Sequence, residues 1–202
     1  MPSRVFLDKP YPEHLPVVPA CADCNAGFSL DEQYVACLIE CSMCGSADPA
    51  AVKRDKIARI LRDTPALAAR IAAARRETAD GVTFAVEFDR VRNVVLKLAR
   101  GHAAFELNEP QFSEPANVGI APLAVIPAED RERFEQPPAQ LIWSEVGSRA
   151  MHRLAGSFPD GDSMGWIVVQ PRRYRYLTAM GPGVTVRMVF SEFLAAEVLW
   201  RR

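Results

Sequence analysis

All five cysteines of the chain lie within a stretch of 24 residues, and the 158 residues that follow contain none. Four of them form two C-x2-C pairs, Cys21 with Cys24 and Cys41 with Cys44, and sixteen residues separate the pairs. This spacing lies within the range of zinc sites built from four thiolates, which tie both ends of the intervening segment to one point. The sequence therefore predicts a Zn²⁺ site with Cys21, Cys24, Cys41 and Cys44 as ligands.

The segment between the pairs has helical character, which gives a competing interpretation. Ser29 and Glu32 form an S-x-x-E capping box, so we expect a helix that begins at Ser29 and runs through the second pair. On such a helix Cys37, Cys41 and Cys44 share one face, and about 16 helical residues would separate Cys44 from the first pair by about 20 Å. A four-cysteine site therefore requires a short or broken helix. The alternative is a buried stripe at Cys37 and Cys41 without metal.

Residues 49–105 are expected to be mainly helical. Apolar residues recur at helical spacing in this region, and a strand with alternating apolar residues interrupts it at 82–88. His102 lies near the end of the last predicted helix, and we interpret it as a helix-end or core residue, as we do His152. No glycine-rich phosphate loop or nucleophile elbow is present in the sequence.

The C-terminal part of the chain has the pattern of an antiparallel meander. Alternating apolar residues predict strands within 166–200, and the GPG sequence at 181–183 predicts a hairpin turn between two of them. Residues 107–140 contain six prolines and are expected to be irregular apart from a strand at 119–126. We therefore expect an α+β fold: an N-terminal metal-binding fragment, a helical middle and a C-terminal meander.

Composition excludes several classes of protein. Hydrophobic residues make up 49% of the chain and charged residues 24%, so a folded core is expected and overall disorder is not. The sequence contains no apolar run long enough to cross a bilayer. Its first sixteen residues lack the apolar core of a signal peptide. We therefore expect a cytoplasmic protein with no membrane segment, and a homo-oligomer is compatible with the sequence.

Charge is unevenly distributed although the formal net charge is only -1. Residues 53–100 contain twelve Lys and Arg residues against six Asp and Glu residues. Such a region can form a basic face that binds the phosphates of DNA. It can equally form ordinary solvated helices with arginines on their outer faces. Both interpretations remain open at the level of the sequence.

The segment PEHLPVVPACADCNAGFSLDEQY, residues 12–34, resembles the second half of an HNH endonuclease module of the ββα-metal, treble-clef type. Members of this family have a C-x-x-C knuckle, a strand that ends in a catalytic histidine, and a segment leading to C-x-x-C-N and a helix. The preceding RVFLDKPYPEHLP is similar to the linker that follows the catalytic E-H pair in bacterial members. The resemblance covers roughly residues 3–40.

The resemblance implies roles for four residues. Cys21 and Cys24 match two zinc ligands, and Asn25 matches a position at the helix start that helps to bind the catalytic Mg²⁺ or Mn²⁺. His14 stands where members usually have an asparagine that orients the catalytic histidine loop. The implied catalytic residues are therefore His14 and Asn25.

In the family order, CADC is the second cysteine pair, so the first pair and the histidine general base are expected before residue 2. This departure implies an HNH relative that is truncated and inactive as it stands, whose full-length form hydrolyses phosphodiesters of DNA. The alternative is a non-enzymatic, zinc-stabilised domain that binds nucleic acid or protein, and a third interpretation has reduced, buried cysteines and no metal. We expect residues 1–46 to form the partial HNH-like segment and residues 47–202 an α+β domain of unknown role.

Overall fold

The structure is a computed structural model that describes residues 2–19, 22–79, 81–138, 146–154 and 165–201. It combines α-helices with an antiparallel five-stranded sheet, which confirms the predicted α+β class. The chain divides into two compact units, one made of Met1–Pro19 with Val95–Arg202 and the other of Ala20–Val94. This division differs from the expected boundary after residue 46, because the N-terminal nineteen residues pack with the C-terminal sheet.

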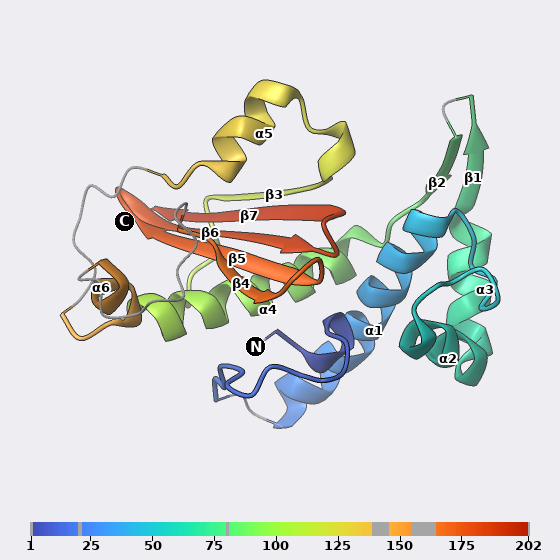
Figure 1. Ribbon diagram of the computed structural model, residues 1–202, viewed down its shortest axis with the longest axis horizontal. Helices are drawn as coiled ribbons and strands as arrows, with labels where there is room; N and C mark the ends of the chain where they lie inside the picture. Colours follow the sequence, from blue (N-terminus) through green and yellow to red (C-terminus); the bar gives the residue numbers. More distant parts are fainter. Residues whose placement is uncertain (1, 20–21, 80, 139–145, 155–164, 202) are drawn as a thin grey trace. The chain divides into compact units, whose positions relative to one another are not determined.

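The unit Ala20–Val94 is built around one long helix (Figure 1). It contains α1, α2, α3, the hairpin strands β1 and β2, and the beginning of α4. Their bounds are α1 Ala22–Cys44, α2 Asp55–Asp63, α3 Pro65–Ala74, β1 Arg75–Thr78, β2 Gly81–Phe84 and α4 Phe88–Leu107. The predicted helices and the strand near residue 82 are present. Residues 75–78, which were expected to be helical, form the strand β1.

The start of α1 differs from the prediction. The helix begins at Ala22, so Ser29 lies inside it and does not cap it. The prolines that prevent a helix end at Pro19, and the single Gly27 in the helix interior costs only about 1 kcal/mol relative to alanine. A helix of 23 residues tolerates that cost. The capping box at Ser29 and Glu32 was therefore a false start signal.

Residues 34–41 of α1 are buried on all sides of the helix. Every residue from Tyr34 to Cys41 is buried, as expected for a helix that is apolar around its whole circumference. Glu40 is the charged residue in this buried stretch, and its carboxylate lies 3.7 Å from the guanidinium of buried Arg54. Near the start of α4, the hydroxyl of Tyr34 accepts a hydrogen bond from the backbone N–H of Glu87 at 2.9 Å. The core of this unit thus forms around the middle of α1.

The other unit contains the five-stranded sheet, with strand order β3-β7-β6-β5-β4 and only antiparallel pairs. The strands are β3 Asn117–Pro122, β4 Ile167–Gln170, β5 Tyr174–Met180, β6 Gly183–Phe190 and β7 Leu194–Arg201. The predicted meander is confirmed, with strand ends within about one residue of those expected. At the tight turn before β6, a Cβ on Gly183 would lie 1.8 Å from the carbonyl oxygen of Trp200, so only glycine fits there.

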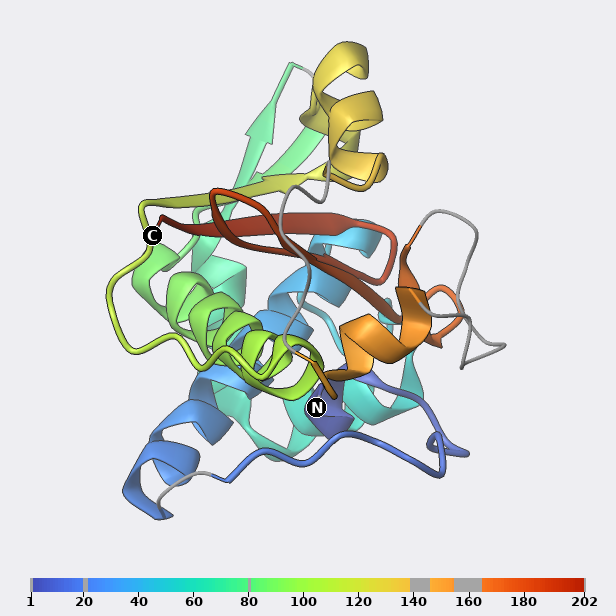
Figure 2. The ribbon, with the colours of Figure 1, turned by 90° about the vertical axis from the view of Figure 1, so that its left-hand side faces the viewer.

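A helix covers each face of this sheet (Figures 1 and 2). On one face lies α4, whose His102 contacts two tyrosines of β5. On the other face lies α5, Ala128–Glu135, whose buried Phe134 belongs to a cluster of apolar residues from the sheet. The other members of that cluster are Leu123, Trp166, Leu177, Ala179, Val189 and Ala195. Successive residues of β5, β6 and β7 therefore contribute side chains to two cores, one on each face of the sheet.

The N-terminal segment docks against the sheet at its β4 edge. Phe6 packs edge-on against Phe190, with ring centroids 5.1 Å apart. The side-chain amide of Gln170 accepts a hydrogen bond from the backbone N–H of Asp8 at 2.8 Å and donates one to its carbonyl at 3.0 Å. The Asp8 carboxylate also pairs with Arg173 at 2.5 Å. These contacts explain why the first residues belong to the unit that contains the sheet.

Candidate functional site

Cys24 of the first cysteine pair lies at the N-terminus of α1. The helix begins at Ala22, immediately after Cys21 in the sequence, so Cys24 and Asn25 fall within its first turn. Cys21 itself lies outside the described residues. In a treble-clef site, one ligand pair comes from the turn that enters a helix, and this is the position that the C-x2-C-N sequence occupies here.

The structure does not bring the two cysteine pairs together. Cys41 lies 17 positions after Cys24 on the same continuous helix, which corresponds to a rise of about 25 Å. A site that used both pairs would require α1 to break. Among the residues described, no group of three or more His, Cys, Asp or Glu side chains is placed to bind a metal ion.

The cysteines in the second half of α1 have the environment of core residues. Cys37 and Cys41 are fully buried, and burial raises the pKa of each thiol to about 12. The thiol of Cys44 lies 3.2 Å from the carbonyl oxygen of Ser46 and 3.6 Å from that of Cys41. The thiols of Cys37 and Cys41 therefore remain protonated at neutral pH and are poor metal ligands. This environment favours the interpretation as a buried stripe for Cys37 and Cys41.

The two residues implied to be catalytic belong to different compact units. His14 is exposed in the loop that follows the docked N-terminal segment, beside a surface pocket lined by Tyr11, Glu13 and Leu15 among others. Asn25 lies on α1 in the other unit. The structure therefore gives each residue a position along the chain but does not define a common site for them.

Much of the positive charge of residues 53–100 is used within the protein. At least five of the twelve basic side chains form ion pairs: Arg54 with Glu40, Arg70 with Glu87, Arg75 with Glu77, Arg90 with Asp31, and Arg100 with Glu114. On α2, the exposed Arg59 and Arg62 lie beside Asp55 and Asp63, which are also exposed. This arrangement of mixed charge favours the interpretation as solvated helices over a basic face for DNA.

The structure assembles a buried polar cluster between α4 and β5. Nε2 of His102 lies 2.7 Å from the hydroxyl of Tyr174, and the imidazole stacks on the ring of Tyr176 with centroids 3.7 Å apart. The hydroxyl of Tyr176 donates a hydrogen bond to Glu106, one turn after His102 on the same helix. All four residues are at most 1% exposed. The sequence analysis interpreted His102 as a helix-end or core residue, and the structure places it in the core with two tyrosines that lie more than 70 residues away.

Burial determines the protonation of this cluster. It lowers the pKa of His102 to about 3 and raises the pKa of Tyr174 well above its ordinary value, so both groups are neutral at physiological pH. Nδ1 of His102 has no hydrogen-bond partner among the described residues. Because solvent does not reach the ring, the cluster stabilises the packing of α4 on the sheet and does not form an active site.

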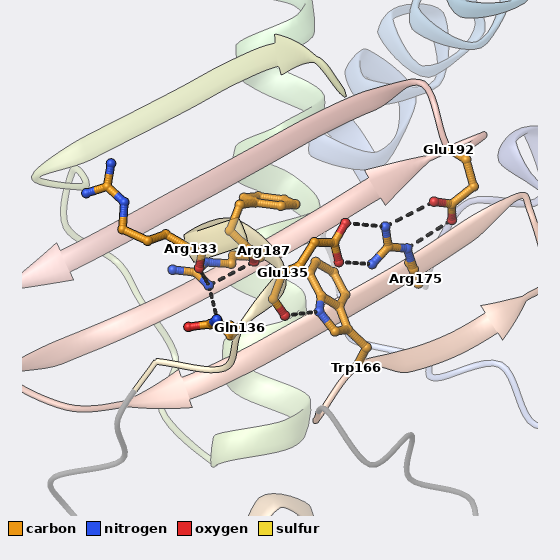
Figure 3. A network of polar contacts seen from close by, with 8 residues as sticks. Arg133, Glu135, Gln136, Trp166, Arg175, Arg187 and Glu192 are labelled. Carbon is orange, nitrogen blue, oxygen red and sulfur yellow. Dashed lines mark hydrogen bonds and ion pairs between the residues drawn. The ribbon is translucent and has the colours of Figure 1, made fainter. Parts of the chain in front are cut away.

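On the opposite face of the sheet, two arginines attach α5 to the strands (Figure 3). Arg187 of β6 donates hydrogen bonds through Nη1 to the last carbonyls of the helix, at 2.9, 2.9 and 2.6 Å from those of residues 133, 134 and 136. Arg175 of β5 forms a bidentate pair with Glu135, at 2.7 and 2.8 Å. Burial alone would lower the pKa of Arg175, but its hydrogen bonds to Glu135 and Glu192 raise it. A cation at the carbonyl end of a helix is also favoured by the helix dipole.

The helix α5 was not predicted from the sequence, and neither was the network that attaches it to the sheet. The available signal was Pro127 followed by Ala-Glu-Asp, a proline before an acidic first turn, which is typical of a helix start.

Comparison of the chain with models of protein families, with curated proteins and with solved structures found no match. Within the described ranges, no helix combines the length and the apolar character that crossing a membrane requires. The fold and the candidate residues define an α+β protein with a C-x2-C-N sequence at the start of a long helix.

Proposed function

We propose that the chain is a relative of the HNH endonucleases, in which Cys21 and Cys24 supply two thiolates to a zinc finger at the N-terminus of α1. The observation that carries the proposal is the start of α1 at Ala22, which puts the C-x2-C-N sequence at the entry of a helix. The resemblance assigns the second cysteine pair of the finger to this place. Zinc supplies structural support there, and the reducing cytoplasm that we propose for the protein keeps such thiols free.

The helix terminus suits the chemistry of these ligands. The N-terminus of a helix carries a partial positive charge, which lowers the pKa of a nearby thiol and favours the thiolate that binds metal. Asn25 follows directly, and its amide oxygen is a ligand type suited to Mg²⁺ or Mn²⁺. Of the three histidines, His102 is buried and neutral, whereas His14 is exposed and lies in the HNH-like segment. We therefore retain His14 and Asn25 as the residues that would serve phosphodiester hydrolysis.

The zinc content of matched double variants tests the metal assignment. We expect the purified wild-type protein to retain zinc, Cys21→Ala/Cys24→Ala to lose it, and Cys41→Ala/Cys44→Ala to keep it, because α1 separates the two pairs. Zinc is measured by atomic emission and the fold by circular dichroism. Equal zinc loss in both variants would show a four-cysteine site instead, and a wild-type protein without zinc would overturn the finger.

A plasmid-nicking assay with Mg²⁺ or Mn²⁺ separates an enzyme from a binding domain. If the chain hydrolyses DNA, His14→Ala and Asn25→Ala should each lower the rate by about 10²- to 10⁴-fold. The matched control is His152→Ala, which removes an exposed histidine outside the HNH-like segment and should leave the rate unchanged. Activity that survives both substitutions would show that the catalytic assignment is wrong. Zinc binding without nicking would fit both an HNH relative that is inactive as it stands and the alternative class of non-enzymatic, zinc-stabilised domains.

A further inference from the structure

A groove lies between α5 and the edge of the five-stranded sheet. Its volume is about 410 Å³, within the range of small-molecule sites. Three small residues of neighbouring strands, Gly119, Ala121 and Ala195, form its floor, and Ile126 and Phe134 line it from the side of α5. The groove exists because these strands carry small residues where larger side chains would fill the space below the helix.

Gly119 has no structural reason to be glycine. Its φ lies outside the left-handed region, and the pairing of β3 with β7 continues through it without a bulge. A Cβ added at Gly119 would have no heavy atom within 4 Å, so neighbouring groups do not exclude a side chain either. Glycine inside a strand weakens it by about 0.5–1 kcal/mol relative to alanine, and such a glycine often marks the approach of a ligand. The open floor is therefore a feature that the strand keeps at a cost in stability.

The charged residues that line the groove are already paired with one another. Arg187 and Glu197 form an ion pair at 2.5 Å, and Arg133 pairs with Asp130 on the exposed side of α5. Arg187 also donates to the carbonyls at the end of α5. Two positive and two negative groups leave the groove without a net charge that would attract an ion. Oε1 of Glu197 offers an acceptor in the groove, because it makes no hydrogen bond with the described residues.

We propose that this groove binds a small, uncharged aromatic molecule of about the size of indole that carries an N–H or O–H group. The flat floor of glycine and alanine accommodates a planar ring, and Phe134 provides an aromatic edge for it. The donor of the ligand bonds to Oε1 of Glu197 at the polar end of the groove. The site lies in the unit with the sheet and is independent of the zinc finger proposed for α1.

Three probes of similar size define the ligand class: indole, 1-methylindole and indole-3-acetate. Binding is followed by two-dimensional ¹⁵N NMR of the full chain, in which the amide signals of Gly119 and Ala121 should shift with saturation. We expect indole to bind about tenfold more tightly than 1-methylindole, which lacks the donor for a charged acceptor. Indole-3-acetate should bind no more tightly than indole, because the groove carries no net charge.

A matched pair of variants locates the site. Gly119→Ile fills the floor with a side chain that suits a strand, and we expect the saturable shifts with indole to disappear while the unfolding midpoint stays equal or rises. Asn117→Ile puts the same side chain on the same strand and face but outside the groove, and binding should persist. Absence of saturable binding in the wild type, or loss of binding in Asn117→Ile alone, would overturn the site. Equal affinities for indole and 1-methylindole would overturn the ligand class.

Discussion

Replacement of Trp166 by alanine is expected to lower the free energy of unfolding of the unit that contains the sheet by about 3–5 kcal/mol. The side chain is 2% exposed, and its ring centroid lies 5.6 Å from that of Phe134 on α5. The guanidinium of Arg175 lies over the indole at 4.4 Å, and the indole N–H donates to the carbonyl of Glu135 at 2.8 Å (Figure 3). The truncation would therefore leave a cavity and weaken three contacts that attach α5 to the sheet.

The matched control is Trp166→Phe, which keeps an aromatic ring but removes the hydrogen bond to Glu135. We expect it to cost about 1–2 kcal/mol, since a typical hydrogen bond contributes about 0.5–1.5 kcal/mol and the smaller ring buries less area. Urea titrations followed by far-ultraviolet circular dichroism give both values. A loss below 1 kcal/mol for Trp166→Ala, or equal losses for the two variants, would contradict the role assigned to the ring.

The C-terminal sheet is the part of the fold that the sequence predicts best. In β5 and β6 successive side chains point to opposite faces of the sheet and most of them are buried, and Gly183 at the turn before β6 leaves no room for a Cβ. Likewise α4 has apolar residues at helical spacing over most of its length, and its predicted start at Asp89 lies one residue from the observed one. In these elements the local pattern and the tertiary environment agree, so local reasoning is sufficient.

The elements that were missed depend on contacts with other segments of the chain. Residues 75–78 continue a helical pattern but form β1, because they pair with β2 across a short turn. The short, polar α5 is attached through Arg187 and Arg175, which lie some 40 to 55 residues after it. Nothing in the local sequence of α5 shows that these arginines will meet it. The capping box at Ser29 failed for the opposite reason, since a strong local signal was overridden by a longer helix.

The candidate sites, like the fold, were predicted from the sequence only in part. The cysteine spacing alone allows a four-thiolate zinc site, and only the continuous α1 shows that its two halves lie apart. The groove beside α5 could not be predicted, because Gly119 looks like an ordinary loop or turn glycine until the strand register places it opposite Glu197. The spacing of residues in the sequence identifies side chains whose chemistry suits a site. Whether these side chains come together in the fold depends on helix length and strand pairing.

Acid should destabilise the protein through His102. Burial lowers the pKa of His102 to about 3 in the folded state, whereas an unfolded chain has the ordinary value near 6.5. Above pH 6.5 the imidazole is neutral in both states and contributes no pH dependence. As the pH falls from 6.5 towards 3, the unfolded state gains a proton that the folded state does not bind. The free energy of unfolding should therefore fall by about 1.4 kcal/mol per pH unit, or about 3 kcal/mol between pH 7 and pH 4.

His102→Phe isolates this contribution. The phenyl ring can stack on Tyr176 as the imidazole does, but the hydroxyl of Tyr174 loses its partner, so we expect a loss of about 1–3 kcal/mol at pH 7. Between pH 6 and pH 4 the free energy of unfolding should fall less steeply for the variant than for the wild type. The two slopes should differ by the contribution of about one proton, as measured by urea unfolding at each pH. His152→Phe is the control, because it makes the same substitution at an exposed histidine outside the buried cluster. Parallel pH profiles for the wild type and His102→Phe would mean that His102 is accessible to protons in the folded protein, which its complete burial against the two tyrosines does not allow.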